Sequence, residues 1–199
     1  MDKCQGSPLG FWLGIGYTVL MHDILNLYKT EDFIVVDIET TGLSAYKGDA
    51  IIELAAERLR GGQVIGEFEH FINPGVPINP DAEAVHGISN FFIQEHGRPL
   101  EEIIPKFFQF AQGAVLVGHN IVNFDLSFIN KHLDELALPR LESPVVDTLR
   151  LARRTLSLPN YKLGTVARHL GVSYDGAHRA MRDVAITRQV FLELLRRFG

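Results

Sequence analysis

The stretch FIVVDIETTG, at residues 33–42, decides the fold. Its apolar and β-branched residues predict a buried central strand over Phe33–Glu39, which a Thr-Gly turn ends. Side chains at i and i+2 of a strand project from the same face, so Asp37 and Glu39 point together. Two acids inside an apolar run repel one another and lose solvation unless a cation neutralises them, and oxygen ligands favour Mg²⁺ or Mn²⁺. The alternative is a strand end that leaves the core with two solvated acids.

The segments that follow predict the rest of an α/β fold. Ile51–Leu59 and Val64–Ile72 flank the glycines at 61 and 62 and predict an antiparallel hairpin. Helices and short strands then alternate, which predicts a mixed sheet of three antiparallel and two parallel strands flanked by helices. The short strands are expected at 114–118 and 144–147, and the helices at 99–112, 123–136, 148–156, 163–170 and 180–198.

Composition describes an ordinary soluble domain. The chain has 199 residues, of which 46% are hydrophobic and 22% charged, and this balance excludes a disordered chain and a membrane bundle. A single cysteine, Cys4, excludes an internal disulfide framework and a cysteine-built zinc site, so a cytoplasmic location is expected. The net charge of −5 excludes a protein that coats nucleic acid by bulk electrostatics.

The N-terminal segment 1–28 is expected to be an apolar extension of a domain that covers residues 29–199. Its uncharged run Leu9–Met21 has 13 residues, whereas a bilayer requires about 20, so stable membrane insertion is not expected. Two interpretations of the extension remain open. It is either sequence upstream of a true start at Met21 or a segment that docks on the domain or on a partner.

A second polar cluster, GHNIVNFD at residues 118–125, leads from a predicted strand end into a predicted helix. An acid at a helix N-terminus interacts favourably with the helix dipole, and this alone could account for Asp125. Gly, His and Asn residues at a strand end also favour a ligand, because the scaffold there is rigid. Asn120 is therefore expected to bond to a base, a sugar or a phosphate.

A third cluster joins His178 to Asp183. Residues five positions apart in a helix lie about 140° apart around its axis, so both cannot share one helix face. His178 is therefore expected in the loop or first turn before the helix that carries Asp183. A neutral imidazole is suited to taking a proton from water near neutral pH. A solvated surface histidine is the alternative.

Taken together, DIETTG at 37–42, GHN at 118–120 with FD at 124–125, and His178 five positions before Asp183 resemble the three motifs of the DEDDh, DnaQ-like exonuclease family. The resemblance covers roughly residues 32–197. Within the family the sequence resembles the proofreading epsilon subunit of bacterial DNA polymerase III. The resemblance implies a ribonuclease-H-like fold and 3′-to-5′ hydrolysis of nucleic acid to nucleoside 5′-monophosphates.

The resemblance also assigns roles to residues. His178 would act as the general base. Two Mg²⁺ or Mn²⁺ ions would be held by four carboxylates, those of Asp37, Glu39, Asp125 and Asp183. The residues around the terminal nucleotide would be Thr40, Thr41, Gly42, Leu43 and Asn120.

The implied substrate is the single-stranded 3′ end of a nucleic acid, DNA in preference to RNA. Resemblance to a proofreading subunit implies work beside a DNA polymerase subunit or in DNA repair. One alternative is an RNA 3′ exonuclease resembling oligoribonuclease or RNase T, which has the same motifs. A catalytically silent binding module is a further alternative, and the presence of all five catalytic residues argues against it.

Overall fold

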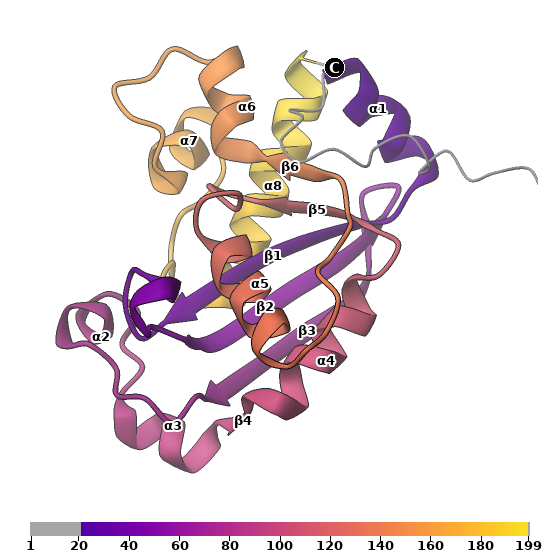
Figure 1. The fold of residues 1–199 in the computed structure, drawn as a ribbon. Coiled ribbons are helices and arrows are strands. Elements are labelled where there is room, and N and C mark those ends of the chain that lie inside the picture. Colours follow the sequence, from indigo (N-terminus) through magenta and orange to yellow (C-terminus); the bar gives the residue numbers. More distant parts are fainter. Residues whose placement is uncertain (1–20, 199) are drawn as a thin grey trace, which may run out of the picture.

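The computed structural model describes residues 21–198, and these form a six-stranded sheet with helices on both faces (Figure 1). The strands are β1 (Phe33–Thr40), β2 (Ile51–Arg60), β3 (Gln63–Asn73), β4 (Arg98–Pro99), β5 (Val115–Gly118) and β6 (Val145–Asp147). The helices are α1 (Met21–Thr30), α2 (Pro80–His86), α3 (Asn90–His96), α4 (Leu100–Ala111), α5 (Asp125–Glu135), α6 (Thr148–Thr155), α7 (Leu163–Leu170) and α8 (Ala180–Phe198), and a 3₁₀ turn, η2, covers Ala45–Lys47.

The strands follow the order β4-β3-β2-β1-β5-β6. β2 pairs antiparallel with both β1 and β3, whereas β5 runs parallel to β1 and β6 runs parallel to β5. This confirms the predicted mixed sheet. The structure adds one strand, β4, whose two residues pair parallel with the end of β3. A pairing of two residues has no periodicity for a sequence to reveal.

β1 lies in the middle of the sheet, and its side chains alternate between two apolar cores. Phe33 and Val35 pack on one face with α1, α6, α7 and α8. Ile34, Val36 and Ile38 pack on the other face with α4 and α5. Burial on both faces explains why β1 reads as an almost continuous apolar run rather than as an alternating one.

α8 runs antiparallel to β1 across the first of these faces. Near its C-terminal end, the ring of Phe191 lies 5.5 Å from that of Phe33, between centroids. Closer to the N-terminal end of α8, Arg188 Nε lies 2.6 Å from a carboxylate oxygen of Glu57 on β2. The N-terminal end of α8 therefore reaches the C-terminal end of β1, where Asp37 and Glu39 continue the row of side chains begun by Phe33.

Three helices were not among the predicted elements. α2 and α3 have seven residues each and begin at the side-chain caps Asn79 and Ser89. α1 packs on the domain through Ile24, which is buried, and Tyr28, whose ring lies 5.7 Å from that of Phe33. The boundary expected between residues 28 and 29 thus falls inside α1.

The interpretations of residues 1–20 lie outside the described residues. Within residues 21–198, no helix combines the length and the apolar character that crossing a bilayer requires.

Truncating Ile24 tests whether α1 is part of the folded domain. Ile24 is 2% exposed, and I24A should lower the free energy of unfolding by about 2–5 kcal/mol because it leaves a cavity under α1. Lys29 is exposed on the same helix, so K29A is a matched control that should change it by less than about 0.5 kcal/mol. Urea denaturation of both variants measures the difference. Equal stabilities would show that α1 does not contribute.

Candidate active site

Three carboxylates meet where β1 ends and α8 begins. Oxygens of Asp37, Glu39 and Asp183 all lie within 4.8 Å of one another. Asp37 and Glu39 share the face of β1 that α8 covers, and Asp183 lies in the first turn of α8. The three side chains thus come together because a strand and a helix 140 residues apart cross at this point.

Burial and mutual repulsion disfavour the ionised form of these acids. Burial is the main cause that raises the pKa of Glu39 to about 8, and the charges of Asp183 and Glu53 add to it. Burial also holds the pKa of Asp37 well above its usual value, with the charge of Asp125 as the next cause. The pKa of Asp183 is raised for the same first reason, and a hydrogen bond from the backbone of His178 opposes the shift.

Asp125 lies beside the cluster on a third element, but it is not among the three acids whose oxygens lie within 4.8 Å of one another. It is the first residue of α5, two residues after the predicted start of that helix, and it is 4% exposed. Burial raises its pKa to about 7. Its charge acts on both Asp37 and Glu39, so all four predicted carboxylates belong to one electrostatic unit.

The donor set fits a divalent cation. Oδ1 of Asp183 is buried and has no hydrogen-bond partner in the structure, so this oxygen is left with unsatisfied lone pairs. Carboxylate oxygens are the ligands that Mg²⁺ and Mn²⁺ prefer, and a cation would remove the repulsion that raises the pKa values. The residues present therefore match the ions that the sequence predicts.

His178 lies two residues before α8, outside the helix as the spacing predicted. Its backbone has a φ of 70°, in the left-handed region, and its backbone N donates to Asp183 Oδ2 at 3.1 Å. The imidazole is exposed, and the ring of Tyr174 meets it edge-on, 6.3 Å away between centroids. The histidine is thus tied to a cluster acid through its backbone, while its side chain remains accessible.

The residues predicted to bind substrate at the end of β1 make hydrogen bonds that stabilise the connection to β2. Thr40 Oγ1 donates to the carbonyl of Gly42 at 2.6 Å, and Thr41 Oγ1 accepts from Ala50 N at 3.0 Å. A Cβ on Gly42 would meet the carboxylate of Asp49, which would have to shift from its hydrogen bond with Ser44 N. Leu43 follows, and it is 86% exposed.

Asn120 lies in the loop between β5 and α5. Its φ is 67°, and its backbone N donates to Asp147 Oδ1 at 3.0 Å. Its side-chain oxygen accepts from Asn123 Nδ2 at 2.9 Å. The neighbouring His119 is a structural residue, since its Nε2 donates to the carbonyl of Tyr161 at 2.8 Å.

Sequence reasoning did not find Glu53, which lies beside the cluster on β2. It is directly opposite Glu39 in the β1–β2 register and is fully buried. Its charge raises the pKa values of Asp37, Glu39 and Asp183. The available signal is the one that singled out Asp37, an acid within an apolar run, here IIELAA at 51–56.

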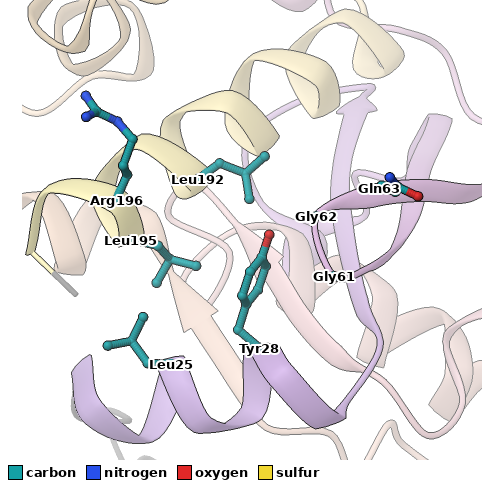
Figure 2. Close-up of a pocket in the computed structure, with 8 residues that line it drawn as sticks. All are labelled: Leu25, Tyr28, Gly61, Gly62, Gln63, Leu192, Leu195 and Arg196. Atoms are coloured by element: carbon teal, nitrogen blue, oxygen red, sulfur yellow. The ribbon is translucent and has the colours of Figure 1, made fainter.

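A cavity of about 460 Å³ lies elsewhere, where α1, the β2–β3 turn and α8 meet (Figure 2). The glycines of this turn follow the residues that pair with the N-terminal end of β1, whereas the carboxylates lie at its C-terminal end. The lining residues are Leu25, Tyr28, Gly61, Gly62, Gln63, Leu192, Leu195 and Arg196. None of the predicted site residues is among them.

Comparison with known sequences identifies relatives of this chain. The model of the exonuclease family matches residues 34–191. PolC-type DNA polymerase III of Caldanaerobacter subterraneus subsp. tengcongensis is 42% identical over 82% of this chain, and that of Thermotoga maritima is 36% identical over 84%. The chain spans 12% of the length of each of these two polymerases.

Solved structures have the same fold. The zinc-bound form of the E. coli ExoI–ssDNA complex matches with a TM-score of 0.75 and 20% identity, over 83% of this chain and 40% of that one. Exonuclease X in complex with 5′ overhanging duplex DNA matches with a TM-score of 0.68 and 24% identity, over 84% of this chain and 93% of that one. These matches confirm the expected ribonuclease-H-like fold. By its family match and its sequence relatives, the chain belongs to the exonuclease family, in the DEDDh, DnaQ-like group.

Proposed function

We propose that this chain is a metal-dependent 3′-to-5′ exonuclease that releases nucleoside 5′-monophosphates from single-stranded DNA ends. The observation that carries the proposal is the cluster of Asp37, Glu39 and Asp183, with His178 tied to its edge. Membership of the exonuclease family supports a phosphodiester hydrolase. DNA is favoured as substrate because the sequence relatives are DNA polymerases and the structural neighbours hold DNA.

Two divalent ions, Mg²⁺ or Mn²⁺, are the proposed cofactors. Their ligands would be Asp37, Glu39, Asp125 and Asp183. When bound, such ions stabilise negative charge on a phosphate and acidify the attacking water. The cluster also explains how a chain of net charge −5 handles an anionic substrate, because the acids would be neutralised where the phosphate enters.

His178 is the proposed general base. Its exposed imidazole would take a proton from the attacking water as the water oxygen bonds to phosphorus. The bond from phosphorus to the 3′-oxygen breaks, and that oxygen leaves with a proton from solvent. The residues proposed to surround the terminal nucleotide are Thr40, Thr41, Gly42, Leu43 and Asn120. Leu43 supplies the exposed apolar contact, and the hydroxyls of the two threonines hold the turn that presents it.

Work beside a DNA polymerase, in proofreading or in DNA repair, is part of the proposal. Its support is the similarity to a portion of PolC-type polymerases. We place the activity in the cytoplasm, in keeping with the single cysteine of the chain.

A panel of substrates tests the activity. Single-stranded DNA with a free 3′ end should yield mononucleotides with Mn²⁺ and none with a chelator, and a 3′-blocked strand should resist. Asp183→Asn should reduce the rate to the chelator level, whereas E95Q, at an exposed acid on α3, should retain it. Degradation of the blocked strand would contradict the polarity. Faster turnover of short RNA than of DNA would identify an RNA exonuclease.

Removing the general base should slow the reaction without unfolding the protein. H178A should lower kcat by about 10²–10⁴-fold, the usual range for a lost acid–base group. Initial rates on single-stranded DNA with saturating Mn²⁺ measure the difference. A variant as fast as the wild type would exclude His178 as the base.

The metal-free protein should lose stability as the pH rises. Burial raises the pKa of Asp125 to about 7 and that of Glu39 to about 8. Carboxyls of an unfolded chain titrate near about 4. The folded chain therefore retains protons that the unfolded chain releases, so its free energy of unfolding decreases from about pH 4 to about pH 8.

Bound metal should oppose this loss. Mn²⁺ at about 100 times its Kd should add about 2.7 kcal/mol. Thermal unfolding at about pH 6 and about pH 8.5, with a chelator or with Mn²⁺, measures both effects. A chelated protein whose Tm rises with pH over this interval would contradict the cluster's electrostatics.

A further inference from the structure

Glu53 is a buried acid that none of the proposed steps uses. Its side chain on β2 is 0% exposed and lies on the same face of the sheet as Glu39, its direct neighbour across the β1–β2 pair. An acid in this place is unfavourable on its own, because burial and the nearby cluster both oppose its charge. Its partners therefore indicate why it is there.

The partners of Glu53 come from the segment that carries His178. Arg179, the next residue, donates from Nε at 3.3 Å and from Nη2 at 3.2 Å to the two carboxylate oxygens. The backbone N of Ala180, the first residue of α8, donates to Oε2 at 3.2 Å. The guanidinium also lies over the ring of Phe71, 5.2 Å from its centroid. One buried carboxylate thus fixes both the arginine and the start of α8.

These contacts fix the backbone on both sides of the histidine. The carbonyl of Arg179 accepts from Asp183 N at 3.0 Å, and His178 N donates to Asp183 Oδ2 at 3.1 Å. His178 has a backbone φ of 70°. Residues other than glycine rarely adopt this left-handed conformation unless the surrounding contacts hold them in it. Release of Arg179 would therefore let the histidine relax away from the cluster.

We infer that Glu53 and Arg179 are positioning residues that hold the imidazole of His178 at the carboxylate cluster. The inference rests on the proposed function, in which His178 takes the proton. A charged pair is not required for stability at such a site, since apolar residues of similar volume often stabilise as well or better. The pair instead supplies directional bonds at the residue next to His178.

A second strand-to-helix pair provides a matched control. Glu57, four residues along β2, binds Arg188 of α8 at 2.6 Å, and its side chain is 7% exposed. Both pairs involve a buried glutamate of β2, which binds Arg188 within α8 in one pair and Arg179, the residue just before α8, in the other. Arg188 lies within α8, ten residues after His178, and its side chain bonds to Glu57 instead of to an acid of the cluster. Loss of either pair should destabilise the fold, but only the first should slow the chemistry.

The experiment compares R179Q with R188Q in the full chain, on single-stranded DNA with saturating Mn²⁺. R179Q should lower kcat by about 10²-fold with little change in KM, as expected when a reacting group is displaced. R188Q should retain kcat at temperatures below its Tm. In the H178A background, R179Q should cause almost no further loss, because a residue that acts through His178 has nothing left to position.

Three results would overturn the inference. They are an R179Q rate equal to that of the wild type, an equal loss from R179Q with and without His178, and a rise in KM alone, which would place Arg179 on the substrate. If R179Q does not fold, E53Q, which keeps the buried volume, is measured in the same way and should show the same loss of kcat. Failure of the wild type to degrade DNA would reject the proposed function itself, whereas an active wild type with a normal R179Q rejects this inference alone.

Discussion

The crowding of mutually repelling, half-buried carboxylates on one face of β1 is the constraint on which the site depends. Phe33 and Val35 begin that row of side chains inside the core, and Asp37 and Glu39 continue it to the strand end. α8 covers the whole row, with Phe191 over its apolar end and Asp183 over its charged end. The same helix therefore seals the core and supplies an acid, so the geometry of the site is set by ordinary apolar packing.

Elements with strong periodicity or strong end signals could be predicted from the sequence. The bounds of α7 and α8 agree with the predicted ranges, and the predicted end of β1 differs by one residue. α1, α2, α3 and β4 were missed for a physical reason. The short helices depend on caps and on a few contacts such as that of Ile24, and β4 depends on where β3 happens to lie. Tertiary packing of this kind leaves little trace in local sequence.

The site divides in the same way. The spacing of Asp37 and Glu39 and the position of His178 outside a helix follow from strand and helix geometry, and the structure has both. The bond between Glu53 and Arg179 joins residues 126 positions apart, so no local pattern could indicate it. Thr40 and Thr41 are predicted to lie around a nucleotide, and in the structure their hydroxyls bond to Gly42 and Ala50 of the β1–β2 connection. These hydrogen bonds depend on the path of the loop, which cannot be predicted from the spacing of residues in the sequence.

The left-handed backbone at Asn120 has a consequence for how nucleases of this shape can diverge. At a φ of 67°, with Asp147 accepting a hydrogen bond from its backbone N, the position accepts glycine or a short polar residue such as asparagine more readily than β-branched or bulky residues. The backbone conformation thus limits which residue types can occupy position 120, whatever the substrate is. New specificities must arise at neighbours that the backbone leaves unrestricted, and Leu43, whose side chain projects into solvent, is such a position.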